Sequence, residues 1–210
     1  ELATLIKQMK RLDQRLKPGE NMFQNLESRL SLLGARRNCL SFDSKALHIP
    51  SFHLSNSDRT CMLKAGGAWR GILMAEPLKK KMKNSVTFRV DNTDGNRHLL
   101  FGICPSSLKN TVQYYYKSNG AIAYYGTGNG SILKNGAQVE SFHYAGAVPQ
   151  AVVTIVADLI KEQVMFYYDE TLISGQNLDK QLLENNGYYF FVDMYTAYDK
   201  VTCLSFNAEQ

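Results

Sequence analysis

The residues that could catalyse a reaction or hold a metal ion are widely separated in this 210-residue chain. The four histidines and four cysteines are His48, His53, His98, His143, Cys39, Cys61, Cys104 and Cys203. No C-x-x-C pair is present, which argues against a zinc ribbon or finger. No G-x-S-x-G sequence places a serine as a hydrolase nucleophile. The sequence therefore predicts no catalytic residue, no metal site and no cofactor.

Two further patterns that enzymes use were considered. Sandwich enzymes that cleave β-glucans carry Glu-x-Asp-x-Glu on one strand, so that both carboxyl groups face one cleft. That spacing is absent, and Asp158, Asp169 and Glu170 flank turns instead. The glycines at 126, 128 and 130 resemble a phosphate-binding loop, but no helical pattern follows them. We therefore expect an ordinary loop between strands there.

Tyrosines in polar loops are the better candidates for function. Such rings offer rigid contact area that is both apolar and hydrogen-bonding, at a low entropic cost. Tyr195 and Tyr198 lie in a loop that is otherwise polar, and we favour them most. Packing within a strand is an equal alternative for Tyr115. The predicted partner-binding residues are Tyr195, Tyr198, Asp199, Tyr115, Tyr125, Thr127 and Asn129.

One dense run of charge, Lys79-Lys80-Lys81-Met82-Lys83, stands out in a chain of net charge +5. It could meet an acidic lipid, a nucleic acid or an acidic partner. No aromatic residues interleave with it to stack on bases. We favour a solvated loop over any of these contacts, and we expect no nucleic-acid partner. Trp69, the single tryptophan, is expected at the core or its edge rather than as a binding anchor.

The sequence predicts that short strands position these residues. The stretch 150–175 contains two runs rich in β-branched and aromatic residues, Val152–Val156 and Val164–Tyr168, separated by polar residues. Neither run alternates cleanly between apolar and polar residues. We therefore expect a hairpin that is covered on both faces. Further strands are expected at 85–91, 98–104, 120–125, 188–192 and 201–206, and Asp94-Gly95 predicts a hairpin between the first two. Short, turn-punctuated strands of this kind indicate an antiparallel β sandwich.

Residues 1–37 have a different, helical pattern. Leu2, Leu5, Met9, Leu12 and Leu16 recur at steps of three and four,. The segment could be the end of a coiled coil that forms a homodimer, or it could pack on the domain that follows. We therefore predict two regions, a helical segment at 1–37 and a β sandwich at 38–210. The first residue is Glu, so we expect further residues to precede it in the native protein.

The order of these blocks resembles the SPRY family and its PRY-SPRY (B30.2) form. Trp69-Arg-Gly-Ile-Leu, Val86-Thr-Phe-Arg-Val and Leu99-Leu-Phe-Gly-Ile are similar to the opening strands of that family. The 152–168 hairpin and the 188–206 strands resemble its later blocks, and Leu40-Ser-Phe-Asp resembles the PRY segment. The resemblance implies a concanavalin-like sandwich of two antiparallel sheets that recognises proteins through loops at one end. A helical segment before such a domain also resembles tripartite-motif proteins.

These observations predict a non-catalytic module that binds a partner protein or peptide. A lectin-like carbohydrate-binding sandwich and a structural scaffold are the alternatives. Any ubiquitin-ligase activity would need a domain that this sequence does not contain. No run of about 20 apolar residues is present to span a membrane,. Because Cys104 and Cys203 lie in apolar runs, as buried thiols do, we expect a reducing compartment and a cytoplasmic location.

Overall fold

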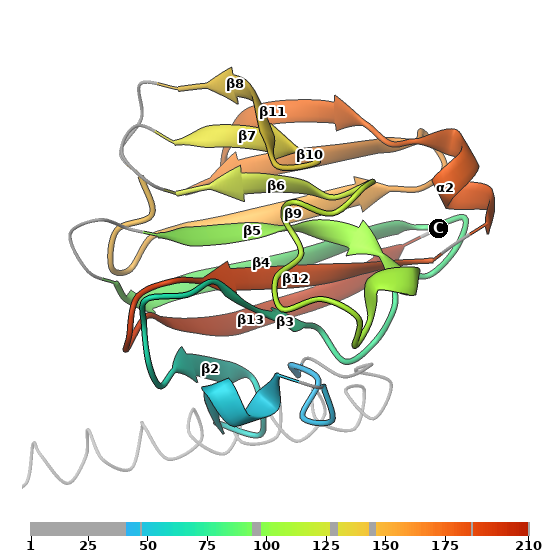
Figure 1. Ribbon diagram of the computed structural model, residues 1–210. Helices are drawn as coiled ribbons and strands as arrows, with labels where there is room; N and C mark the ends of the chain where they lie inside the picture. The colour runs from blue at the N-terminus through green and yellow to red at the C-terminus, as the bar shows by residue number, and fades with distance from the viewer. Residues whose placement is uncertain are drawn as a thin grey trace, which may run out of the picture. The chain divides into compact units, whose positions relative to one another are not determined.

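The computed structural model describes residues 41–46, 48–93, 98–126, 130–142, 146–185 and 187–209. These form two stacked antiparallel sheets, with the six-stranded sheet in front of the seven-stranded sheet in Figure 1. The larger sheet has the order β1 (Phe52–Ser55), β2 (Thr60–Leu63), β13 (Lys200–Glu209), β4 (Lys83–Asn92), β9 (Val152–Asp158), β10 (Gln163–Tyr168) and β11 (Thr171–Asn177). The smaller has the order β3 (Arg70–Leu73), β12 (Tyr188–Met194), β5 (Leu99–Pro105), β6 (Ile122–Tyr125), β7 (Ser131–Lys134) and β8 (Ala137–Ser141). The predicted two-sheet sandwich is confirmed.

Helical structure is minor in the described ranges. It comprises η2 (Ile49–Ser51), η3 (Ser106–Leu108) and α2 (Lys180–Asn185). No helix among the described residues is long and apolar enough to cross a membrane. The predicted helical segment 1–37, and with it the boundary at residue 38, lies outside the described residues.

The alternation of side chains explains how the sheets face each other. In β4, Val86, Phe88 and Val90 are buried and the residues between them are half-buried. Since successive side chains of a strand point to opposite faces, one face of β4 lines the core. Phe88 meets Phe101 of β5 across that core, with ring centroids 5.7 Å apart. Apolar side chains from both sheets therefore form the main core of the domain.

A second apolar layer lies on the outer face of the six-stranded sheet. Strands β5 and β12 are buried along their whole length. The segment 106–121, which leaves the end of β5, crosses this face; Tyr115 and Tyr116 pack there with Leu100, Cys104 and Phe191. Figure 1 shows this segment running in front of β12. Strands β5 and β12 are thus covered on both faces, whereas β8 at the edge of this sheet is mostly exposed.

Two expectations about hairpins need correction. Strands β4 and β5 do not pair with each other, because they belong to different sheets and face each other across the core. The β9–β10 hairpin is confirmed, with Val164 opposite Ala157 and Phe166 opposite Ile155. It is not covered on both faces, however. Thr154 and Tyr167 point outward and are half-buried, so only one face of this hairpin lies against the core.

Candidate functional site: an aromatic cluster at the loop end

Strand register brings four distant positions together at one end of the sandwich. Met194, the last residue of β12, lies opposite Arg70 of β3 and also opposite Leu99 of β5. The adjacent residues Trp69, His98 and Tyr195 are therefore neighbours across three strands. Tyr125 ends β6 opposite Leu100 of β5, and so joins them. We call this the loop end of the sandwich.

Trp69 is the centre of an aromatic cluster at the loop end. Its ring centroid lies 5.2 Å from Tyr116, 5.4 Å from Tyr195, 5.9 Å from Tyr125 and 6.1 Å from His98. We define the aromatic cluster as these five residues. All except Tyr116 are half-buried, so the cluster presents both apolar ring surface and polar atoms to solvent,.

A hydrogen bond fixes one side of the cluster. The hydroxyl of Tyr125 lies 2.6 Å from Nδ1 of His98, and the two rings stack with centroids 6.1 Å apart. The ring of Tyr195 meets the ring of His98 edge-on, with centroids 5.3 Å apart. Aromatic pairs in such geometries each contribute about 0.5–1.5 kcal/mol beyond their buried area. The cluster is therefore a preformed surface rather than a set of independent side chains.

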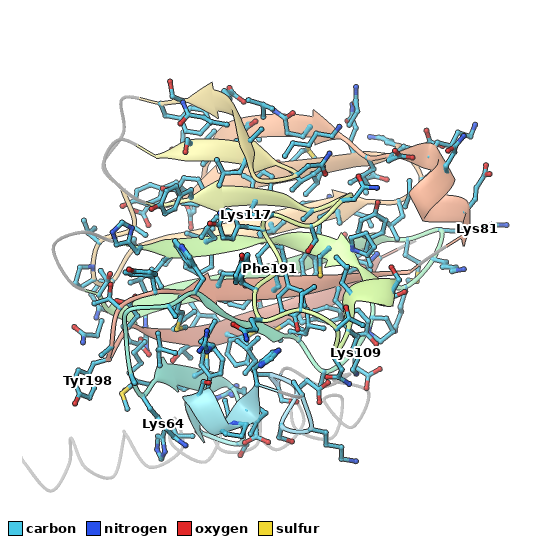
Figure 2. All side chains as sticks on the ribbon, in the orientation of Figure 1. Lys64, Lys81, Lys109, Lys117, Phe191 and Tyr198 are labelled. Carbon is cyan, nitrogen blue, oxygen red and sulfur yellow. The ribbon has the colours of Figure 1, made fainter. Side chains whose placement is uncertain are left out.

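Tyr198 projects from the β12–β13 loop, three residues after Tyr195 of the cluster. Its side chain is 62% exposed, and its backbone lies in the left-handed region at φ +69°. The backbone N–H of Tyr198 donates to the Leu63 carbonyl at 2.8 Å, and its own carbonyl accepts from Asn92 Nδ2 at 3.1 Å. A residue other than glycine in this region typically costs about 1–3 kcal/mol. These two hydrogen bonds hold the backbone of Tyr198 in this conformation, from which its side chain projects into solvent (Figure 2).

Asp199 supports this loop from inside, which corrects its predicted role as a contact residue. The residue is fully buried. Its carboxylate oxygen Oδ2 accepts the backbone N–H of Thr196 at 3.2 Å, and its backbone carbonyl accepts the N–H of Leu63 at 3.0 Å. Asp199 therefore stabilises the conformation that displays Tyr198, and it does not itself face a partner.

Tyr115 is also buried, at 1% exposure, so the expectation that it contacts a partner is corrected. Its ring packs on Phe191 with centroids 5.6 Å apart, and burial raises the pKa of its phenol. The backbone N–H groups of Tyr115 and Tyr116 both donate to Oδ2 of Asp193 at 2.9 Å. The alternative of structural packing is the correct one for this residue.

Asp193 thus anchors the segment that carries Tyr116 into the aromatic cluster. The side chain is fully buried, and burial raises its pKa from 3.8 to about 7, although the two backbone donors act in the opposite direction. Its second oxygen, Oδ1, is buried and has no hydrogen-bond partner among the residues that the structure describes. A carboxyl group in this setting carries a proton more readily than one in water.

The predicted site residues therefore separate into distinct groups. Tyr195, Tyr198 and Tyr125 lie at the surface of the loop end, whereas Tyr115 and Asp199 are buried. Thr127 and Asn129 lie outside the described residues. Sequence reasoning missed Trp69, His98 and Tyr116 as cluster members. Trp69 and His98 could have been found from their positions in the chain. Each directly precedes a strand that pairs with β12.

The ionisable residues considered for catalysis have structural roles. Oδ1 of Asp158 accepts the backbone N–H groups of Ile160 and Lys161, and Oδ1 of Asp169 accepts that of Val152. Cys61, Cys104 and Cys203 are buried free thiols whose pKa values are raised by burial. Within the described ranges, no three His, Cys, Asp or Glu side chains are grouped so that they could hold a metal ion.

Comparison with known proteins identifies the fold. Neither a scan against protein-family models nor a search of curated proteins found a match. Solved structures do match. The SPRY domain of human HERC1 aligns with a TM-score of 0.60 at 12% identity, over 79% of this chain and 98% of that domain. The chain has the SPRY fold.

Two other SPRY structures support this assignment. The TRIM65 PSpry domain aligns with a TM-score of 0.60 at 12% identity, over 78% of this chain and 90% of that one. A further human SPRY domain aligns with a TM-score of 0.53 at 9% identity, over 73% of this chain and 94% of that one. The resemblance inferred from the order of sequence blocks is therefore confirmed as a likeness of fold.

Proposed function

We propose that this SPRY-fold domain is a non-catalytic module that binds a partner protein or peptide through its loop end. The observation that carries the proposal is Tyr198, a ring that is 62% exposed on a strained backbone fixed by hydrogen bonds at both its N–H and its carbonyl. Tyrosine is among the residues most enriched at binding hot spots.

The aromatic cluster supplies the rest of the proposed surface. The half-buried rings of Trp69, Tyr125 and Tyr195 offer apolar area, while His98 and the tyrosine hydroxyls can exchange hydrogen bonds with a peptide backbone,. Because the rings already pack on one another, little side-chain entropy is lost on binding. A partner with an apolar or aromatic side chain next to exposed backbone would suit this surface.

We also propose a cellular setting for the domain. Its free, buried thiols suit a reducing compartment such as the cytoplasm,. The leucine stripe of residues 1–37 suits a helical segment that forms a homodimer, as in a tripartite-motif-like protein,. A dimer would present two loop ends and raise the avidity for a repeated partner.

The test compares the parent chain with Tyr195→Ala/Tyr198→Ala in affinity purification from native lysate, followed by calorimetry with each recovered protein. Tyr167→Ala, a half-buried tyrosine on the outer face of β10, is the matched control. We expect a partner that binds the parent and the control directly but binds the double variant at least about tenfold more weakly.

Equal binding by the parent and the double variant would exclude the loop end as the contact surface. Binding to a glycan array that is lost in the same double variant, with no direct protein partner, would support the lectin-like alternative instead. Circular dichroism of all three proteins ensures that a loss of binding does not reflect unfolding.

A further inference from the structure

A concave surface lies at the end of the sandwich opposite the loop end. Figure 2 shows Tyr198 and Lys81 at opposite ends of the sheets. Near Lys81 a pocket of about 250 Å³ is formed by the loop before β4, the turn between β9 and β10, and helix α2. The pocket is lined by Lys80, Lys81, Leu159, Glu162, Lys180, Leu183 and Glu184. We call it the lysine pocket.

The basic loop that forms one wall of the lysine pocket is held in a fixed conformation. Asn84 is fully buried, and its side-chain amide accepts the N–H of Lys79 at 2.8 Å. The same amide donates to the carbonyls of Lys79 and Met82 at 3.0 and 3.1 Å. Lys81 has a left-handed backbone at φ +55°. The loop is solvated, as its sequence predicts, and its backbone is therefore also preorganised.

Hydrogen bonds also connect the other walls. The N–H of Leu159 donates to the Met82 carbonyl at 3.1 Å, which joins the β9–β10 turn to the basic loop. The N–H of Leu178 donates to the Glu162 carbonyl at 2.8 Å, which joins that turn to the segment before α2. Leu159 and Leu183 pack against the core and supply apolar lining, and Ile160 is 60% exposed on the same turn.

The charges around the pocket are mixed, with the free cations on one side. Lys180 lies 4.0 Å from Glu162, and Lys161 lies 3.9 Å from Asp158. Among the described residues, neither Lys80 nor Lys81 forms an ion pair, and both are exposed. These two cations flank apolar lining, and the pocket is large enough to admit a side chain.

We propose that the lysine pocket binds a short acidic peptide segment that inserts one apolar side chain. The apolar side chain would contact Leu159 and Leu183, and flanking carboxylates would meet Lys80 and Lys81. Glu162 and Glu184 line the same pocket, where their carboxylates can accept hydrogen bonds from the backbone N–H groups of a bound peptide,. This site is separate from the loop end and does not depend on the function proposed for it.

The probe is a synthetic peptide, acetyl-Asp-Glu-Leu-Glu-Asp-amide, titrated into the ¹⁵N-labelled 210-residue chain and followed by NMR and calorimetry. We expect shifts in the amides of residues 80–81, 159–162 and 180–184 but not in those of the aromatic cluster. Lys80→Glu/Lys81→Glu should weaken binding by about tenfold or more, because it replaces attraction by repulsion. Lys45→Glu/Lys64→Glu changes the net charge equally at exposed sites elsewhere and should leave the affinity unchanged.

A second variant tests the apolar part of the pocket. Leu183→Ala should weaken binding of the leucine peptide but not of the same peptide with alanine in place of leucine. The proposal is overturned if no amide around the pocket shifts, or if the two charge variants weaken binding equally. It is also overturned if the chain binds phosphatidylserine vesicles through Lys80 and Lys81 without binding the peptide.

Discussion

Tyr115 and Tyr198 have the same side chain, lie in similarly polar loops, and have opposite environments. Tyr115 is 1% exposed and packs on Phe191, whereas Tyr198 is 62% exposed. The backbone N–H of Tyr115 donates to a buried carboxylate of the sheet beneath it, which draws the loop down onto that sheet. The backbone of Tyr198 bonds to Leu63 and Asn92 at the edge of the loop end. Backbone partners, rather than local composition, decide which tyrosine is displayed.

The largest predicted effect is on stability, at the buried member of this pair. Tyr115→Ala should lower the free energy of unfolding by about 3–5 kcal/mol, because it leaves a cavity against Phe191 and Cys104. Tyr198→Ala should change it by less than about 0.5 kcal/mol, because the ring is exposed. Urea denaturation of both variants measures the difference. Similar losses for the two would show that their environments are not as distinct as their exposures indicate.

A smaller loss of folding stability is expected when a substitution overpacks the side chains around Tyr115. A Cβ at Gly71 would collide with Asp193 Oδ1 and lie 2.6 Å from the Tyr115 ring. Gly71→Ala should therefore cost about 1–3 kcal/mol, as overpacked cores do. Gly175→Ala is the control, because its nearest atom would lie 3.9 Å away. Thermal unfolding of the two variants checks this, and a neutral Gly71→Ala would argue that the covering segment moves easily.

The Asp193 anchor of Tyr115 should make stability depend on pH. Its pKa is about 7 in the folded protein and 3.8 ordinarily, so the folded state holds a proton that the unfolded chain releases. Its contribution to stability is complete below pH 3.8 and is lost as the pH rises toward about 7,. Cys104 and Tyr115, its ionisable neighbours, stay neutral there because burial raises their own pKa values.

Asp193→Asn removes this proton but keeps an oxygen that can accept both backbone N–H groups. We expect the fall in urea midpoint between pH 4.5 and pH 7.5 to be smaller in the variant than in the parent, with the difference arising from this one group. Parallel pH profiles for the parent and Asp193→Asn would contradict the raised pKa.

The smallest predicted effect is at the displayed tyrosine. At φ +69° glycine is unstrained, so Tyr198→Gly should be as stable as Tyr198→Ala or more stable, by up to about 1 kcal/mol,. Both variants should lose partner binding equally. A glycine variant that is less stable than the alanine variant would show that the backbone at Tyr198 is not strained.

The sequence predicted β4 because its inward residues Val86, Phe88 and Val90 alternate with more polar ones. It predicted most other strands because short runs of β-branched, aliphatic and aromatic residues lie between turn signals. It misassigned the β4–β5 hairpin because Asp94-Gly95 is a local signal, whereas membership of a sheet depends on which apolar faces meet. Tyr195, Tyr125 and Tyr198 were chosen by residue type; they lie at the surface of the loop end and remain predicted contact residues. The sequence did not predict that Trp69 and His98 are neighbours. Their contact depends on β3 and β5 both pairing with β12, and no local sequence pattern predicts that pairing.

The position of β12 and β13 within the sheets has a consequence for when the aromatic cluster can form. These two strands come last in the described chain, yet β12 lies between β3 and β5, and β13 between β2 and β4. Contacts between residues so distant in sequence slow folding. During synthesis, neither sheet can close until these strands leave the ribosome, and Trp69 and His98 remain apart until then. A chain that lacks β12 and β13 would therefore leave the aromatic cluster unassembled, and with it the binding surface proposed above.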